Sequence, residues 1–362
     1  MRLPLVILSL FLSSSVSVLA QEFKAPTFVD EVTLPTAFSM NGVRFGGISD
    51  LSYDAAAGNY LAIADDRAEN GPVRFYRIAV KADKGKIATL DILGMQELLA
   101  PGGAHFPLKG ADPEGIALDG ANKRIFWSSE RNEKNVPMLY VADQDGTNAK
   151  SITLPDAYIP NADGSKGVLT NLGFEGLDLS ADGATLYAMN ENGLAQDGGK
   201  ATIAQESASR LMLLDTQTLA PKAQYIYLTD KIPVAPEKAD GWADNGVSAV
   251  HAMKDGRLIV VERNFTDGHG FNIRFYIADA TGATDVSGME KVSAAEIKPM
   301  AKTPWFSLKD GDNGLKIDNI ESIAFGPMLD GKQTMLLASD NNFSPDQASK
   351  FTLFTVDIPA LH

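Results

Sequence analysis

The chain has 362 residues, no cysteine and a formal net charge of −14 at pH 7. Without cysteine it forms no disulfide, so the stability of its fold must come from packing, hydrogen bonds or bound ions. The excess of acidic residues argues against binding to nucleic acid or to an anionic membrane, and we expect neither as a partner.

The start of the chain has the pattern of a secretory signal peptide. Arg2 supplies a short basic region, residues 3–12 form an apolar run, and small residues precede a cleavage site after Ala20. The apolar run is too short to span a bilayer, and no longer run follows it. We therefore expect residues 1–20 to be removed and residues 21–362 to form a periplasmic or secreted protein.

The rest of the chain repeats one pattern, a β-hairpin that ends in a polar cluster. Each copy has an apolar strand, a turn rich in glycine, aspartate or asparagine, and a second apolar strand. The five copies occupy residues 46–69, 112–132, 171–192, 245–265 and 319–343. Repetition of this kind indicates a repeat architecture.

Further strands follow these hairpins. A third strand follows every copy, and a fourth follows the first three copies, at residues 87–93, 149–154 and 223–228. In the fourth copy the only candidate is the weak segment 290–297, and the chain ends before the fifth copy can supply one. The unpaired segment 27–35 can complete that last sheet from the N-terminus, and closure by a terminal strand is how propellers protect their edges.

These strands predict an all-β protein, a single β-propeller with five four-stranded blades closed by the N-terminal strand. The repeat of roughly 60 to 75 residues is longer than a compact blade, and its surplus lies in loops. The longest of these loops are residues 94–110, 158–170 and 229–244. Two alternatives stay open: a sixth, degenerate blade within these connections, and a sandwich of unrelated hairpins.

Carboxylates recur at two positions of the hairpin, the start of its first strand and the end of its second. These two ends lie at the same edge of an antiparallel hairpin, and the first strands of a propeller line its central channel. The strand-start residues are Ser49, Glu114, Glu175, Ser248 and Glu321. The strand-end residues are Asp65, Glu130, Glu191, Glu262 and Asp340. We therefore expect carboxylates from several blades to meet at one end of the channel.

Converging carboxylates need compensation. At ~4 Å and an effective dielectric near 20, each like-charge contact costs about 4 kcal/mol. Raised pKa values, a bound cation or paired arginines relieve this repulsion. Carboxylate and amide oxygens suit a hard cation, calcium above all, whereas softer metals need the cysteine or histidine ligands that are absent or sparse here.

The expected metal ligands are the acids of both positions. They are Glu114, Glu175, Glu321, Glu130, Glu191, Glu262 and Asp340. In the alternative interpretation, these acids only accept hydrogen bonds from backbone amides of the adjacent blades.

The motifs of the hairpins, taken in order, resemble those of a known family. The series GGISDLSYD, DPEGIALD, GFEGLDLS, NIESIAFGP and LLASDNNF is similar to the bacterial phytase-like family, described as having an esterase-like activity of phytase. The resemblance implies a secreted or periplasmic β-propeller that hydrolyses phosphate or other esters, with calcium ions in an acidic funnel. The residues that it marks are Glu114, Glu175 and Glu321, with Glu130, Arg131, Glu262, Arg263, Asp340 and Asn341 around them. The funnel motifs hold few lysines, which argues against phytate as the substrate.

These residues lead to the hypothesis of a calcium-dependent hydrolase that acts on an ester or phosphoester bond of a small molecule. The cation would polarise the ester and activate a water molecule, and a ring carboxylate, Glu114 or Glu175, would act as base. Arg131 or Arg263 would stabilise the developing negative charge. The alternatives are a non-catalytic periplasmic binding or scaffold propeller with a structural cation, and a propeller enzyme that acts on a sugar or lactone. We expect a monomer.

Overall fold

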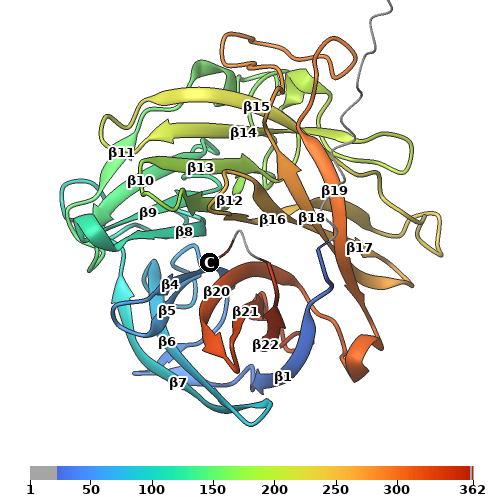
Figure 1. Cartoon of the computed structure of the whole chain (residues 1–362). Coiled ribbons are helices and arrows are strands. Elements are labelled where there is room, and N and C mark those ends of the chain that lie inside the picture. The colour runs from blue at the N-terminus through green and yellow to red at the C-terminus, as the bar shows by residue number, and fades with distance from the viewer. Residues whose placement is uncertain (1–22, 359–360, 362) are drawn as a thin grey trace, which may run out of the picture.

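Short apolar runs separated by tight turns make this chain fold into strands almost throughout. The computed structural model describes residues 23–358 and 361, so the expected signal peptide lies outside the described residues. The described residues form five four-stranded sheets, which are the blades of one propeller (Figure 1). This confirms the all-β, five-bladed prediction, and the described connections contain no sixth four-stranded sheet.

Within each blade the strands follow one another from the channel outward. The first blade is β4 (Ile48–Asp54), β5 (Asn59–Ala64), β6 (Arg74–Asp83) and β7 (Lys86–Glu97). The second blade is β8 (Pro113–Asp119), β9 (Arg124–Ser129), β10 (Met138–Asp143) and β11 (Lys150–Ile152). The third blade is β12 (Phe174–Leu179), β13 (Thr185–Asn190), β14 (Ser207–Asp215) and β15 (Pro221–Thr229). The fourth blade is β16 (Ala243–Ala252), β17 (Leu258–Thr266), β18 (Gly270–Asp279) and β19 (Ala301–Lys309). A small hairpin of β2 (Ser39–Met40) and β3 (Val43–Arg44) stands apart from the blades.

The fifth blade joins the two ends of the chain. It consists of β20 (Ile320–Leu329), β21 (Lys332–Ser339), β22 (Ser349–Val356) and β1 (Thr27–Leu34). Strand β1 is antiparallel to β22, with Thr27 opposite Thr355 and Leu34 opposite Ser349. The N-terminal strand therefore closes the ring as predicted, and it covers the edge that β22 would otherwise expose.

The fourth strand of the fourth blade is β19, so the assignment of residues 290–297 to this strand was wrong. In β19, Trp305 and Leu308 are buried against β18. Pro304 obscures the strand pattern, but an outermost strand tolerates a residue without an N–H donor. Residues 290–297 instead form turns, and Val292 packs with Ala208 of the third blade.

Glycines let the first strands of neighbouring blades pack closely around the channel. A Cβ on Gly115 would lie 2.5 Å from the Cβ of Leu177, and one on Gly176 would lie 2.7 Å from Val250 Cγ1. Real Cβ atoms do not approach so closely, so only glycine fits these positions. Each of these glycines directly follows a strand-start glutamate, and the close approach of the strands brings those glutamates toward one another.

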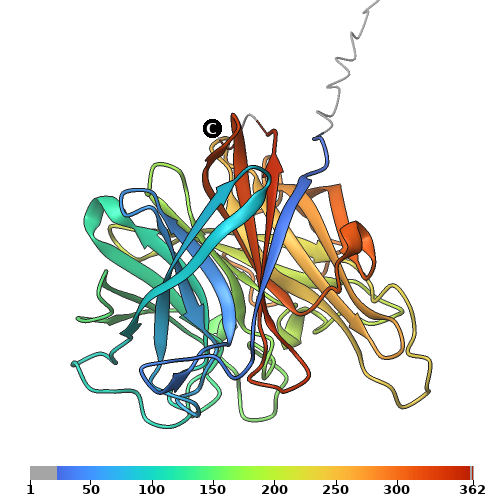
Figure 2. The same cartoon turned by 90° about the horizontal axis from the view of Figure 1, so that it is seen from below.

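The two faces of the propeller differ. Strand β22 starts at the edge that holds the carboxylates and ends at the opposite face, where β1 begins. Figure 2 shows the C-terminus at this opposite face and the long connecting loops at the other one. The acidic end of the channel is therefore surrounded by loops.

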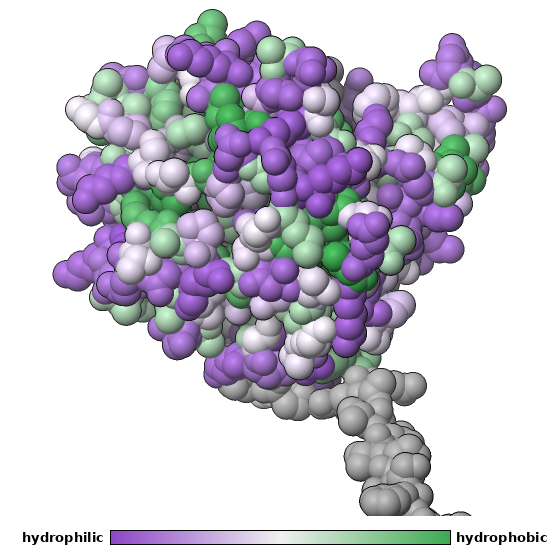
Figure 3. Space-filling model, turned by 90° about the horizontal axis from the view of Figure 1, so that it is seen from above, coloured by the Kyte–Doolittle hydropathy of each residue, from purple (hydrophilic) through white to green (hydrophobic). Residues whose placement is uncertain are grey.

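The side of the propeller in Figure 3 has polar residues over most of its area and small, separate apolar patches. Among the described residues, no helix has both the length and the apolar character needed to cross a membrane.

Candidate functional site

A β-bulge marks the strand-start position in every blade. The pairing of the first and second strands shifts between Ile48 and Asp50 in the first blade, and an equivalent shift occurs in the other four. The residues that the shifts leave unpaired are Ser49, Glu114 with Gly115, Glu175, Ser248 and Glu321. Bulges re-aim side chains and are common beside active sites. The same local distortion thus presents the strand-start residue of all five blades at one end of the channel.

Two groups of carboxylates come together there. The oxygens of Glu130, Glu175 and Glu191 lie within 4.8 Å of one another. The oxygens of Asp65, Asp112 and Glu114 form a second group with the same spacing. All of these acids are buried except Asp65, which is partly exposed. Both groups combine residues of neighbouring blades, as the repeat predicted.

A cavity of about 240 Å³ opens between the two groups. The acids that line it are Asp65, Glu114, Glu175, Glu191, Asp244 and Glu321. The cation in its wall is Arg263, whose Nη1 donates to Glu321 Oε1 and to Asn319 Oδ1, the latter at 2.8 Å. Nη2 of the same arginine lies 3.5 Å from Glu191 Oε1. Acidic groups therefore outnumber guanidinium groups in the wall of this cavity.

In the second carboxylate group, two arginines offset the negative charge of Asp112. Arg131 Nε lies 2.6 Å from Asp112 Oδ2, and Arg67 Nε lies 3.4 Å from the same atom. Arg131, which we expected beside a substrate, is thus paired with Asp112, whereas Arg263 lines the cavity. In the same group, Ser49 donates a 2.6 Å hydrogen bond to Glu114 Oε2 and fixes that carboxyl.

Glu262 does not join the other acids. Its carboxylate accepts hydrogen bonds from Tyr227 at 2.8 Å, Asn245 at 3.0 Å and Arg274 at 3.2 Å, and it also pairs with Lys302. These partners satisfy the buried charge within the fourth blade and the adjoining β15. The structure therefore places Glu262 in an ion-pair network apart from the two carboxylate groups.

Three further residues of these positions, Glu130, Asp340 and Ser248, form hydrogen bonds with backbone groups. Glu130 accepts a 2.9 Å hydrogen bond from Gly173 N, and Asp340 accepts one of 2.8 Å from Asn342 N. Ser248 donates a 3.3 Å hydrogen bond to the carbonyl of Ile320. The alternative role, a hydrogen bond from a backbone amide of an adjacent blade, is thus present at Glu130 and at Glu262, which also accepts from Asp230 N at 3.1 Å. The bond at Asp340 is local.

Glycines position two of the strand-end glutamates. A Cβ on Gly173 would lie 2.5 Å from Glu130 Cγ, and one on Gly246 would lie 2.4 Å from Glu191 Oε1. Each glutamate therefore reaches over a glycine of the next blade, and a larger residue would displace its carboxyl group.

Burial and mutual repulsion change the acidity of the site. Burial raises the pKa of Glu130 to about 7 and the pKa of Glu191 to about 8, although Arg263 opposes the change at Glu191. For other members of the groups, burial and then neighbouring carboxylates raise the pKa well above the usual range. These are Asp65, Glu114 and Glu175. Such carboxyl groups can hold protons near neutral pH or exchange them for a cation.

The donor set suits a hard cation. Both groups offer carboxylate oxygens from three side chains, and oxygen-rich sites of this kind bind calcium or magnesium. The acidic groups could therefore hold a metal ion. Glu130, Glu175 and Glu191 fit best, because Arg263 approaches one oxygen of this group at 3.5 Å, whereas two arginines pair with Asp112 in the other group.

The sequence pattern missed several residues of the site. Asp112, Asp244 and Asn319 contribute to it, and each stands just before a strand-start position. The signal was present in the sequence: each lies two to four residues before a strand-start residue, as in DPEG and NIES. Because they precede the apolar strands, an analysis of strand ends alone passes over them.

Comparison with known proteins gives the family. The family model "Phytase-like: Esterase-like activity of phytase" matches residues 43–343. A protein of Arthroderma benhamiae described as an uncharacterized secreted protein is 28% identical in an alignment of 186 positions that covers 43% of this chain and 35% of that protein. The match thus spans about a third of that relative's length.

The solved structures that match this chain have low sequence identity to it. A thermostable family-43 glycoside hydrolase has a TM-score of 0.47 at 13% identity, with 90% of this chain and 97% of that chain covered. MPT-4, a mannose phosphorylase from Leishmania mexicana in complex with phosphate ion, has a TM-score of 0.41 at 10% identity, with 94% and 89% covered. The family match extends over most of the propeller, and the chain belongs to the phytase-like family.

Proposed function

We propose that this protein is an exported, metal-dependent hydrolase that cleaves an ester or phosphoester bond of a small molecule at the acidic cavity. The observation that carries the proposal is the group of Glu130, Glu175 and Glu191, whose buried oxygens lie within 4.8 Å of one another. Three carboxylates so close together cannot all stay charged without a counterion. The match to a family described by an esterase-like activity supports hydrolysis as the chemistry.

The residues of the cavity suit complementary roles. Glu130, Glu175 and Glu191 would hold the ion, for which calcium fits the oxygen donors. When bound, a divalent cation polarises an ester oxygen and lowers the pKa of a water molecule. Glu114, held by Ser49, is a buried carboxyl group whose raised pKa suits it to carry a proton. Arg263 lines the cavity and is positioned to stabilise negative charge on the substrate.

A second candidate is a non-catalytic binding or scaffold propeller that holds a structural cation. The small volume of the cavity, about 240 Å³, and the burial of most of its acids favour this role. Both candidates need the same ion, so they differ only in turnover.

Export and a monomeric state belong to the same proposal. The apolar start of the chain and the relative described as a secreted protein support export. The closed ring supports a monomer, because β1 of the same chain completes the fifth blade and no second chain is needed to pair with β22.

The test compares chelator-treated protein with and without added calcium on 4-nitrophenyl phosphate, bis(4-nitrophenyl) phosphate and 4-nitrophenyl acetate. We expect calcium-dependent turnover of at least one compound, which Glu175→Gln abolishes. Glu296→Gln is the matched control, since Glu296 is exposed and makes no side-chain hydrogen bond or ion pair in the described structure. Absence of turnover together with a calcium-dependent rise in Tm would overturn hydrolysis and leave the structural-ion candidate.

A further inference from the structure

A second pocket, of about 730 Å³, adjoins the acidic cavity at the loop-covered face. Phe265, Phe271 and Gln347 line both the pocket and the cavity, so the two lie side by side. We call this pocket the aromatic groove. A ligand that lies in it can extend a substituent toward the carboxylates.

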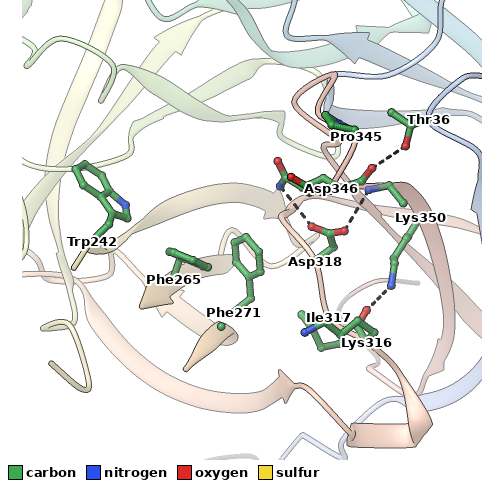
Figure 4. Close-up of a pocket in the computed structure, with 13 residues that line it drawn as sticks. Thr36, Trp242, Phe265, Phe271, Lys316, Ile317, Asp318, Pro345, Asp346 and Lys350 are labelled. Carbon is green, nitrogen blue, oxygen red and sulfur yellow. Dashed lines mark hydrogen bonds between the residues drawn. The ribbon is translucent and has the colours of Figure 1, made fainter. Parts of the chain in front are cut away.

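One wall of the groove is a row of aromatic rings. Trp242, Phe265 and Phe271 stand in sequence along this wall (Figure 4). The rings of Phe265 and Phe271 lie 4.9 Å apart between centroids. Together they form an apolar surface whose faces carry partial negative charge.

Trp242 is exposed yet fixed in place. It is 56% exposed, which is unusual for so large an apolar side chain. Its Nε1 donates to Asp244 Oδ2 at 3.1 Å, its backbone N donates to Asp267 Oδ2 at 2.6 Å, and Lys200 Nζ lies 5.1 Å from its ring centroid. Asp244 also lines the acidic cavity, so the same carboxylate connects the indole ring to that cavity. An indole held by hydrogen bonds rather than by burial is pre-organised for stacking.

The opposite wall is polar, and its lysines are engaged by other groups of the protein. Asp318 accepts hydrogen bonds from Ala348 N at 3.2 Å and from Gln347 Nε2 at 3.4 Å (Figure 4). Lys316 pairs with Asp310, and Lys350 donates to the carbonyl of Lys316. The lysines of the groove are thus engaged by the protein, and the wall offers hydrogen-bonding groups rather than a free cationic cluster.

These two walls suit a ligand with an apolar face and a hydroxylated edge. A neutral sugar ring has this form: its C–H groups carry slight positive charge and stack on aromatic faces, while its hydroxyl groups bond to carboxylates and amides. A purely aromatic ring would leave the polar wall without partners, and a polyphosphorylated ring would find no cationic cluster in the groove. We propose that the aromatic groove binds a neutral sugar ring and that the substrate of the acidic cavity is an ester carried by such a sugar.

The binding part of this inference stands by itself, whereas the reaction part rests on the proposed function. Binding is tested by saturation-transfer NMR on the full chain with methyl β-glucopyranoside and methyl α-mannopyranoside, with glycerol as an acyclic control and inositol hexakisphosphate as a polyanionic one. We expect transfer to the ring C–H protons of at least one glycoside and none to glycerol.

Variants of Trp242 give the sharpest control. Trp242→Ala should weaken glycoside binding roughly three- to tenfold, the contribution of one aromatic contact, and Trp242→Phe should restore part of it. Met328→Ala is the matched control, because Met328 is 52% exposed and lies at the far end of β20. The proposal is wrong if neither glycoside shows transfer, if transfer is unchanged in Trp242→Ala, or if inositol hexakisphosphate binds more tightly in a Trp242-dependent manner.

The reaction part is tested with 6-O-acetylglucose and glucose 6-phosphate against ethyl acetate and ethyl phosphate. We expect Trp242→Ala to raise KM several-fold more for a sugar ester than for the ethyl esters. Equal KM changes for sugar and ethyl esters would contradict the sugar subsite. Hydrolysis of no ester, with glycoside binding intact, would instead overturn the proposed function and leave the groove as a sugar site.

Discussion

The acidic cavity should make the metal-free protein less stable as pH rises, and calcium should reverse this loss. Folding raises the pKa of Glu130 and Glu191 above the values that these groups have in an unfolded chain. A carboxyl group of this kind is unfavourable to the folded state once it ionises. Its contribution to stability is therefore complete at low pH and is lost as pH rises through the folded-state pKa.

The size of the effect follows from the shifts. For Glu130 the pKa moves from 4.5 to about 7. At 1.36 kcal/mol per unit, ionising this group above its folded-state pKa costs roughly 3 kcal/mol of stability. Glu191, with a pKa of about 8, adds to the loss, although the two groups interact and their contributions do not simply sum. We expect the Tm of the metal-free protein to fall by about 5 °C or more between pH 5 and pH 8.

Calcium should act in the opposite sense, because it binds the ionised carboxylates and displaces their protons. The assay is differential scanning calorimetry of chelator-treated protein at several pH values, with and without calcium. The rise in Tm on adding calcium should be small at pH 5 and large at pH 8. The double variant Glu130→Gln and Glu191→Gln should show a flatter pH profile than Glu296→Gln. A Tm that is independent of pH in the metal-free protein, or a calcium effect of equal size at both pH values, would refute this reasoning.

Three further outcomes are expected. Asp66→Asn breaks a fully buried ion pair with Arg74, whose Nη1 lies 2.6 Å from Asp66 Oδ2. It should lower the free energy of unfolding in urea by about 3–5 kcal/mol, and a loss below about 1 kcal/mol would contradict this expectation. Gly246→Ala places a Cβ 2.4 Å from Glu191 Oε1. It should weaken calcium binding about tenfold in calorimetric titration and leave the circular dichroism spectrum unchanged. An unaltered affinity would show that the Glu191 carboxyl group is not a ligand. A chain without residues 23–35 loses β1 and leaves β22 unpaired, so it should aggregate in size-exclusion chromatography; a stable monomer would show that β1 is dispensable.

Much of the fold could be predicted from the sequence, because each blade consists mainly of strands that are consecutive in the chain. The repeated hairpins, the terminal strand at Thr27–Leu34 and the convergence of Glu114, Glu175 and Glu321 follow from strand period and from the shared edge of a hairpin. The exception was β19, where Pro304 and the lysines hide a strand that its neighbour β18 stabilises.

The detailed pairing of the acids depended on residues distant in the sequence. Glu262 looked equivalent to Glu191, yet Lys302, 40 residues further along the chain, neutralises it. Arg131 and Arg263 occupy the same position of the repeat, but Asp112 engages the first and Glu321 the second. The bulges at the strand starts are equally absent from the sequence pattern, since they arise from how each strand pairs with its neighbour.

The central claim is that carboxylates from different blades form one binding site for a divalent cation. Its most direct measurement is isothermal titration of calcium into chelator-treated protein, wild type beside Glu175→Gln and Glu296→Gln, in two buffers of different ionisation enthalpy. We expect saturable binding with proton release in the wild type and in Glu296→Gln, and an affinity at least tenfold weaker in Glu175→Gln. Absence of binding in the wild type, or equal affinity in all three proteins, would contradict the claim.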